Sequence, residues 1–334
     1  MLGEVSAGEA AEVRLSVHKD QSMLDCNKRL TLPLLDWLER RPWDVTDLPL
    51  AVHDVPTMIS LQERALLYLL ARDRYEGFGG IVDAGCFLGG STLALAQGLL
   101  DRNSPVRDRV IHTFDLFRLD EGSYQPYASI LGGLQPGDSL RPTFEALLEH
   151  RAAIVNMREG DVRDQEWTAG PVEILFIDLA KDWSINDHVA RMFFPSLIPG
   201  QSVVLQQDYV HEWTPWLHIL MEFLGDAFTY CGCVPFASAI FVPRRRIRAE
   251  ELPDNLFADV SHEEKLILFD HSARRFDGED RGVVECARAY LLYMIGQTAA
   301  AQAHLDEVEK NYQGARIDSI LPNMRKACAS ASPT

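Results

Sequence analysis

The chain has 334 residues, of which 47% are apolar and 24% are charged, and its formal net charge is −17. This composition is typical of a globular protein with ample apolar material for a core, and it excludes collagen-like, low-complexity and coiled-coil proteins. The acidic balance argues against broad binding of nucleic acids or anionic membranes, because both need a positive surface potential. We therefore expect neither a nucleic acid nor a membrane as a partner.

Cysteine usage and the N-terminal residues indicate the compartment. Six cysteines in 334 residues are too few for a disulfide scaffold, and none of them forms a CxxC pair. The first residues, Met1-Leu2-Gly3-Glu4, lack the basic stretch and the apolar run of a signal peptide. No segment approaches the roughly 18 uninterrupted apolar residues of a membrane span. We expect a protein of the reducing cytoplasm.

The predicted elements alternate between helices and strands over most of the chain. The N-terminal residues are mixed, with a short helix over Leu30–Arg40. An amphipathic helix is expected over Leu61–Arg72, with Ser60 and Glu63 as a capping pair. The strands that follow are expected over 81–84, 110–114, from 154 onwards, 172–177 and 202–205, and the helices over 91–100, 144–151, 185–194 and 212–223. Two further strands, over 228–234 and 236–242, form a final hairpin.

Apolar strands separated by helices predict a parallel sheet that is covered on both faces. We expect an α/β fold with a doubly wound, mostly parallel seven-stranded sheet, a terminal antiparallel hairpin, and helical additions at the N- and C-termini. Beyond about residue 250 the pattern predicts helices over 266–274, 283–296 and 298–310 without strands. The expected domains are an N-terminal segment (1–59), the sheet domain (60–248) and a helical appendage (249–334) that forms a homo-oligomer or covers the site.

Acidic residues follow the predicted strands in a series. Ligands of open α/β sheets bind beyond the carboxyl ends of the strands, so the residues at those ends are candidates for a site. They are Asp83, Asp115, Asp161, Asp178 and the pair Gln207-Asp208. One carboxylate at a strand end is common, whereas an ordered series favours a shared binding site.

A glycine-rich loop, DAGCFLGGS from Asp83 to Ser91, connects the first strand to the next helix. Gly85 and Gly89 remove side chains where backbone and ligand must approach, and a helix N-terminus attracts a negative group. The spacing is GxxxGGS rather than GxGxxG, and no Walker-type lysine follows, which argues against a nucleotide phosphate. A tight structural turn is the alternative interpretation of this loop.

Together these segments resemble class I S-adenosylmethionine-dependent methyltransferases. The loop from Asp83 to Ser91 resembles the first motif of the macrocin O-methyltransferase type, which acts on sugars of natural products, and also that of the catechol O-methyltransferase type. The other matching stretches are His112–Phe117, Gly160–Val162, Leu175–Asp178, Phe194–Gly200 and Gln207–Tyr209. The resemblance covers about residues 60–242.

The resemblance implies S-adenosylmethionine as the cofactor. This ligand carries no phosphate, and a carboxylate accepts hydrogen bonds from both ribose hydroxyls, which is the role implied for Asp115. Its carboxylate can lie near the amides that begin the helix. A loop cap is the alternative role of Asp115. The residues implied for the cofactor are Asp83, Gly85, Phe87, Gly89, Ser91, Asp115 and Asp161.

In the resembling families a divalent metal lies on an acid after strand four and on two adjacent residues after strand five. The matching positions are Asp178, Gln207 and Asp208, and carboxylate oxygens suit Mg²⁺. The macrocin type has Asp-Asp-Tyr where this chain has Gln207-Asp208-Tyr209. Because the amide brings no charge, a metal would be bound less tightly here, and a site without a metal is the alternative.

Three side chains are candidates for the chemistry of the acceptor. Asp178 would hold the metal or orient the acceptor, and Lys181 follows it by three residues, as the general base does in the catechol type. His211 suits proton transfer near neutral pH. The alternatives are a surface Lys181 paired with Asp182, and a structural His211.

The long segment Leu119–Pro142, with Tyr124 and Tyr127, has the length of an active-site lid. Trp183, Trp213 and Trp216 follow strand ends and would line an acceptor pocket or pack in the core.

The expected function is methyl transfer to a hydroxyl of a small-molecule acceptor, such as a sugar or a secondary metabolite, with assistance by Mg²⁺ left open. One alternative is a non-catalytic protein that keeps this fold and the cofactor, which Gln207 favours. The other is a nicotinamide-dependent oxidoreductase, against which the missing GxGxxG spacing argues.

Overall fold

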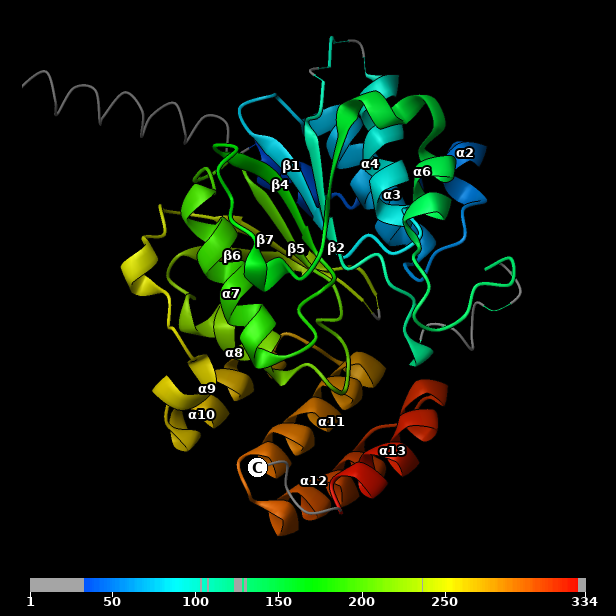
Figure 1. Cartoon of the computed structure of the whole chain (residues 1–334). Helices are drawn as coiled ribbons and strands as arrows, with labels where there is room; N and C mark the ends of the chain where they lie inside the picture. Colours follow the sequence, from blue (N-terminus) through cyan, green and yellow to red (C-terminus); the bar gives the residue numbers. More distant parts are fainter. Residues whose placement is uncertain are drawn as a thin grey trace, which may run out of the picture.

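The computed structural model describes residues 33–102, 104–106, 108–122, 128, 131–235 and 237–329. Its centre is a seven-stranded sheet in the order β3-β2-β1-β4-β5-β7-β6 (Figure 1). The strands are β1 (Gly80–Ala84), β2 (Ile111–Asp115), β3 (Val155–Glu159), β4 (Val172–Ile177), β5 (Val203–Gln206), β6 (Phe228–Cys233) and β7 (Ala239–Pro243). Strands β1 to β5 pair in parallel, and β7 is antiparallel to β5 and β6. The predicted fold class is confirmed.

Helices flank the sheet and continue past its last strand. They are α2 (Leu50–His53), α3 (Leu61–Leu69), α4 (Gly90–Asp101), α6 (Arg141–Leu148), α7 (Trp183–Phe193), α8 (Pro215–Phe223), α9 (Leu256–Asp259), α10 (His262–Ala273), α11 (Gly278–Met294), α12 (Thr298–Asn311) and α13 (Ala315–Ala327). The short 3₁₀ or π segments are η1 (Pro42–Asp44), η2 (Leu70–Arg74), η3 (Glu149–Ile154), η4 (Val162–Asp164), η5 (Phe194–Ser196) and η6 (Ala249–Glu251). Of the predicted helix over Leu30–Arg40, residues 33–39 are described and helical.

Strand burial explains why the sheet has helices on both faces. All six residues of β4 are buried, and successive side chains point to opposite faces. Ile174 and Phe176 belong to the core with α3 and α4, whereas Leu175 and Ile177 belong to the core with α7 and α8. A strand that is apolar on both faces is stable only between two layers of helices.

Capping side chains fix where the helices begin. Ser60 and Glu63 form the predicted capping box of α3: the Ser60 hydroxyl accepts from the Glu63 amide at 3.2 Å, and the Glu63 carboxylate accepts from the Ser60 amide at 2.8 Å. The carboxylate of Asp182 accepts from the Ile185 amide at 2.8 Å and begins α7. Asp182 therefore caps a helix and does not pair with Lys181.

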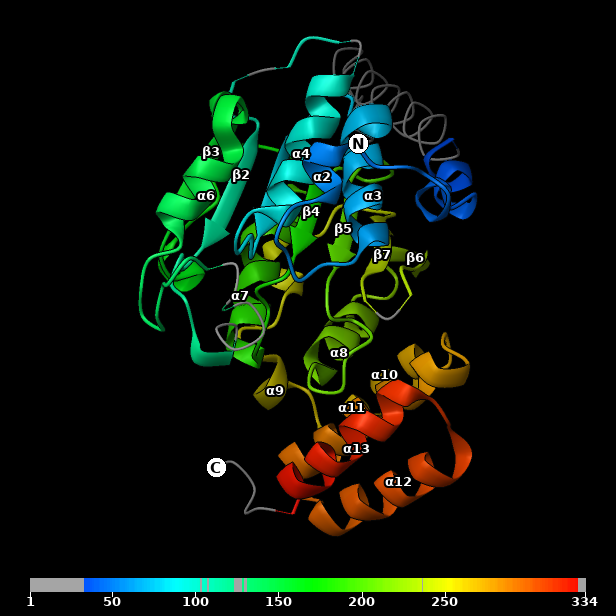
Figure 2. The ribbon, with the colours of Figure 1, turned by 90° about the vertical axis from the view of Figure 1, so that its right-hand side faces the viewer.

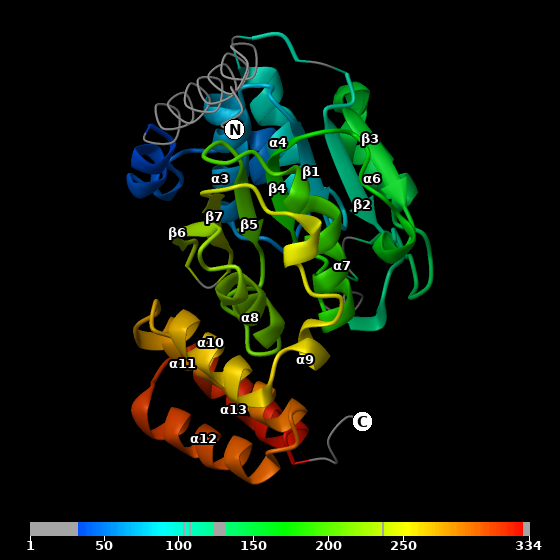
Figure 3. The same cartoon turned by 90° about the vertical axis from the view of Figure 1, so that its left-hand side faces the viewer.

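The C-terminal helices pack against the sheet domain through a continuous core. The apolar cluster on the α8 face of the sheet includes Leu217 and Leu220 of α8 and also Phe269, Val283 and Leu305 of the appendage. Figures 1 and 2 show helices α10 to α13 gathered at one end of the molecule, and Figure 3 shows α8 between them and the sheet. The sequence pattern missed α9 and α13. Within the described residues, no helix combines the length and the apolar run that a membrane crossing needs.

Candidate active site

The strand order reverses between β1 and β4, and a cavity of about 360 Å³ opens beyond the carboxyl ends of these strands. Crevices at such a reversal bind ligands in open α/β sheets, and this volume suits a small molecule. The lining residues are Met58, Gly85, Phe87, Asp115, Leu116, Arg118, Asp120, Leu140, Gly160, Asp161, Val162, Arg163, Asp178, Leu179, Lys181 and Ile185. Five of the predicted strand-end residues and loop positions therefore meet at one place: Gly85, Phe87, Asp115, Asp161 and Asp178.

The glycine loop after β1 lies against the loop after β4. Gly85 has φ 96°, and a Cβ there would lie 2.7 Å from the backbone carbon of Asp178. A side chain at Gly85 would therefore separate the two loops. Gly89, with φ 97°, is the N-cap of α4, where a Cβ would lie 3.1 Å from the Phe144 ring. Gly89 does not line the cavity, so its described role is to begin the helix.

Asp83 was implied for the cofactor, but it is buried beneath the loop and does not line the cavity. Its side chain is fully buried, and one oxygen accepts from the hydroxyls of Ser91, at 2.9 Å, and Thr92. Ser91 is also buried and does not line the cavity. Burial raises the pKa of the Asp83 carboxyl to about 6, although the two hydroxyls oppose this shift. The hydrogen bond between Asp83 and Ser91 thus connects β1 to the start of α4.

Asp115, at the end of β2, reaches the cavity with its carboxylate fixed by the backbone. One oxygen accepts from the Phe87 amide at 2.9 Å and the other from the Phe117 amide at 2.7 Å. Burial raises the pKa of this carboxyl, and the amide hydrogen bonds oppose the rise. Each carboxylate oxygen has more than one lone pair, so both can accept further hydrogen bonds from a ligand. The two amides fix the orientation of the Asp115 carboxylate at the cavity wall.

Asp161 lines the cavity, but its carboxylate is paired with Arg163. The guanidinium donates to Asp161 at 2.5 Å, and the Arg163 amide donates to it at 2.9 Å. These hydrogen bonds lower the pKa of Asp161 to about 2. The cavity therefore presents an ion pair at the position where the sequence predicted a single acid. Arg163 was missed because a cation two residues after an acid is common on protein surfaces.

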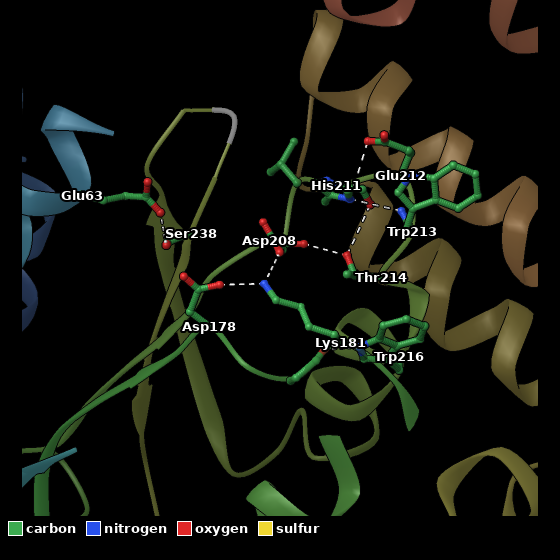
Figure 4. Close-up of polar contacts among 12 residues, drawn as sticks. Glu63, Asp178, Lys181, Asp208, His211, Glu212, Trp213, Thr214, Trp216 and Ser238 are labelled. Carbon is green, nitrogen blue, oxygen red and sulfur yellow. Dashed lines mark hydrogen bonds and ion pairs between the residues drawn. The ribbon is translucent and has the colours of Figure 1, made fainter. Parts of the chain in front are cut away.

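Lys181 lies between the two carboxylates that were predicted to hold a metal (Figure 4). Its Nζ donates to Asp178 Oδ1 and to Asp208 Oδ2, each at 2.6 Å. Burial opposes the charge of Lys181, but the two carboxylates outweigh it and raise the pKa of the ammonium. Burial also opposes the charge of Asp208, and the Lys181 ammonium holds the pKa of that carboxyl below its ordinary value. For Asp178, burial and the neighbouring Asp208 raise the pKa.

These residues do not fit the predicted divalent site of Asp178, Gln207 and Asp208. The position between the two acids is taken by the Lys181 ammonium, and Gln207 contributes no charge. The buried Oε1 of Gln207 has no hydrogen-bond partner in the structure. Across the part of the chain that the structure describes, no group of three His, Cys, Asp or Glu side chains could hold a metal ion. In this arrangement Lys181 also acts as a donor, not as the predicted base.

His211 lies beside this cluster but does not line the cavity. Its Nδ1 accepts from the Trp213 amide at 3.3 Å and is 3.6 Å from a carboxylate oxygen of Glu212. The same loop is closed by Thr214, whose hydroxyl donates to the Asp208 carbonyl at 2.6 Å. These contacts favour the structural alternative for His211.

The segment after β2 contributes Leu116, Arg118, Asp120 and Leu140 to the cavity. The described part of the predicted lid therefore borders the cavity. Tyr124 and Tyr127 lie outside the described residues. None of these four lining residues was predicted as a site residue. The long irregular segment Leu119–Pro142 was the sequence signal for Asp120 and Leu140, and Leu116 lies in the matching stretch His112–Phe117.

The three tryptophans pack outside the cavity. Trp183 contacts Trp216 and Phe257, with ring centroids 6.0 and 5.1 Å away, and the ring of Trp213 lies 5.0 Å from that of Tyr290. They join the sheet domain to the helices that follow it, so they belong to the packing of the core.

Glu63 is a further buried acid that sequence reasoning did not connect with the site. Its carboxylate accepts from the Ser238 hydroxyl at 2.6 Å and from Ser60, and Figure 4 shows it on the side of Asp178 away from His211. Burial raises the pKa of Glu63. No sequence signal links α3 to Ser238, because the two are 175 residues apart.

The strand order, the antiparallel end strands and the position of the glycine loop agree with the α/β fold that the resemblance to class I S-adenosylmethionine-dependent methyltransferases implied. No protein-family model and no curated protein sequence matches the chain.

Among solved structures, the chain is similar to CalS11, a TDP-rhamnose 3'-O-methyltransferase of calicheamicin biosynthesis, with 19% identity, a TM-score of 0.41, and coverage of 67% of this chain and 94% of that chain. It is also similar to cofactor-bound Rv0187 from MTB, with 16% identity, a TM-score of 0.38, and coverage of 64% and 90%. A third similar structure is the pyocyanin biosynthetic protein PhzM, with 18% identity, a TM-score of 0.32, and coverage of 55% and 57%. The fold class itself follows from the strand order of this chain.

Proposed function

We propose that the protein is an S-adenosylmethionine-dependent O-methyltransferase that acts on a hydroxyl of a small molecule. The observation that carries the proposal is the carboxylate of Asp115, which two amides orient into a cavity at the reversal of the strand order. A carboxylate in this position suits the two ribose hydroxyls of a nucleoside. The chemistry of the cavity supports a nucleoside without phosphates, because its acids outnumber its cations: Asp115, Asp120, Asp161 and Asp178 against Arg118, Arg163 and Lys181.

In this proposal one set of residues binds the cofactor and another binds the acceptor. Asp115 binds the ribose, and the exposed Leu116 beside it offers an apolar surface to the base. When bound, S-adenosylmethionine supplies an electrophilic methyl group on a sulfonium sulfur. Asp178 and Lys181 lie in the loop after β4 and line the cavity, and they hold the acceptor oxygen.

The proton of the acceptor hydroxyl requires a base within hydrogen-bond reach. Lys181 donates to Asp178 Oδ1, which leaves Oδ2 to accept from the acceptor hydroxyl. Methyl transfer would form the new carbon–oxygen bond, break the bond between the methyl carbon and the sulfonium sulfur and leave a neutral thioether, while the O–H bond of the acceptor would break and its proton would pass to Asp178. The third N–H of Lys181 donates to the same acceptor oxygen. No step of this proposal uses Mg²⁺, because Lys181 occupies the position between the carboxylates.

The acceptor is proposed to be a small hydroxylated molecule, such as a sugar or another secondary metabolite. The cavity of about 360 Å³ supports a small molecule. A cytoplasmic location and a homo-oligomeric assembly remain predictions from the sequence.

The test is calorimetry with S-adenosylhomocysteine, followed by transfer of a labelled methyl group to a panel of sugars, phenols and polyketide-type alcohols. We expect saturable binding with one site per chain and labelled product with at least one hydroxylated acceptor. No binding would contradict the cofactor assignment. Binding without transfer to any acceptor would favour the non-catalytic alternative, and binding of NAD instead would favour the oxidoreductase.

A further inference from the structure

We infer that Lys181 is a built-in cation that takes the place of a divalent metal between Asp178 and Asp208, so that the site works without a metal ion. The inference deepens the proposed function, on which the role of the acceptor oxygen rests. Metal binding by Asp178 and Asp208 can be measured without any methyl transfer.

The ammonium of Lys181 bridges the two acids. Lys181 Nζ lies 2.6 Å from one oxygen of each carboxylate, although the two acids come from the ends of different strands, β4 and β5. The Lys181 amide donates to the Leu179 carbonyl at 2.8 Å, and this tight turn directs the side chain back over the strand end. Surface lysines often pair with a single acid. A lysine that bridges two partly buried acids compensates the negative charge of both carboxylates.

Both acids are held in place by the backbone around them. The Asp178 amide donates to the Ala84 carbonyl at 2.6 Å, and Asp208 has a left-handed backbone with φ 57°. Next to Asp208, the fully buried Tyr209 is hydrogen bonded through its hydroxyl to Ser272 at 2.9 Å. The two carboxylates thus form a preformed site for one cation, and the ammonium occupies it.

The charge of Lys181 and its third N–H group both favour a site without a metal. A divalent ion between the same oxygens would lie within a few ångströms of the ammonium, and the repulsion would oppose its binding. The side chains of Asp178 and Asp208 are 16% and 23% exposed, so water screens this repulsion only in part. Two of the three N–H groups of Lys181 go to the carboxylates, and its side chain is 53% exposed and lines the cavity. The remaining donor can therefore meet an acceptor oxygen, as a metal would.

The test measures binding of Mn²⁺ by electron paramagnetic resonance and by calorimetry. We expect no saturable binding to the wild-type protein. Lys181→Ala should uncover the two carboxylates and bind Mn²⁺ at least about tenfold more tightly than wild type, because a neighbouring positive charge has been removed. Lys181→Met, which keeps most of the apolar stem, should gain binding in the same way and guards against a folding defect in the alanine variant.

Matched controls separate this site from the rest of the cavity. Arg163→Ala removes another cavity cation, which is paired with Asp161, and should gain no Mn²⁺ site. Asp208→Asn combined with Lys181→Ala should lose the gained binding. Calorimetry of Lys181→Ala with S-adenosylhomocysteine reports on the proposed function independently of the metal.

The inference is overturned if the wild-type protein binds Mn²⁺ as tightly as the lysine variants, or if folded Lys181→Ala and Lys181→Met gain no binding. Loss of wild-type methyl transfer in EDTA, with recovery on addition of Mg²⁺, would overturn it as well.

Discussion

Replacement of Asp115 is the most direct test of how the cavity recognises its ligand. In the structure its carboxylate accepts from the amides of Phe87 and Phe117, and Asp115 lines the cavity. A hydrogen bond to a charged group contributes about 1.5 kcal/mol or more, so two ribose hydroxyls on this carboxylate amount to about 3 kcal/mol. Asp115→Ala should therefore weaken binding of S-adenosylhomocysteine about 100-fold.

The same substitution removes the acceptor of two backbone hydrogen bonds, which should lower the free energy of unfolding by about 2–4 kcal/mol. Asp115→Asn keeps the shape and one acceptor oxygen, so it should lose less stability and about tenfold in affinity. The assay is calorimetry at a temperature where each variant is folded, with unfolding followed by circular dichroism in denaturant.

A cavity control separates hydrogen bonding from overall charge. Asp120 lines the same cavity and is exposed, so Asp120→Asn removes one negative charge without removing the carboxylate that the amides orient. We expect it to change the affinity for the neutral S-adenosylhomocysteine by less than about threefold, because exposed charges are screened. The reasoning is refuted if folded Asp115→Ala binds like wild type, or if Asp120→Asn loses as much affinity.

Three further substitutions test the supports of the site. Because the pKa of Asp83 is raised to about 6 in the folded state, its contribution to stability is present at low pH and is lost as the pH rises through that value. Between pH 5 and pH 8 the wild type should lose about 1.4 kcal/mol relative to Asp83→Asn, and parallel pH profiles in urea would contradict this. Ser60→Ala removes the acceptor that caps α3 at Glu63 and should cost about 1 kcal/mol, measured by denaturant unfolding against Ser60→Thr. Tyr209→Phe removes its hydrogen bond to Ser272 and should cost about 1 kcal/mol, and an unchanged unfolding midpoint would show that the bond contributes nothing.

Local sequence patterns predicted the sheet well because its strands are buried on both faces. The run VEILFI was predicted as a strand over 172–177 and forms β4 with the same bounds, since six consecutive apolar or buried residues suit a central strand. In contrast, α13 contains Pro322 and has polar residues over much of its length. A proline inside a helical pattern indicates a break, so the packing of Ile317 and Leu321 on the appendage was not predictable locally.

The site was predictable where topology alone brings residues together. Parallel strands end at one edge, which is why Asp115 and Asp178 meet at the cavity. The direction of each side chain was harder to predict from the sequence. A carboxylate at a strand end can point either into the cavity or under the next helix, and Asp83 points under α4. The bridge from Lys181 to Asp208 spans 27 residues and depends on the conformation of two loops. Spacing could suggest a partner for Lys181 at Asp178 but could not reveal the second acid.

The shared core of α8 and the C-terminal helices restricts how ligands can reach the cavity. Arg316 of α13 donates to the Val210 carbonyl at 2.6 Å, and Phe269 and Leu305 are buried together with Leu217. A hinged swing of the appendage would expose this apolar surface to water, at a cost that grows with every side chain uncovered. Leu116 and Arg118 line the cavity and are exposed, so ligands are expected to enter past them, while the appendage stays fixed against Val210.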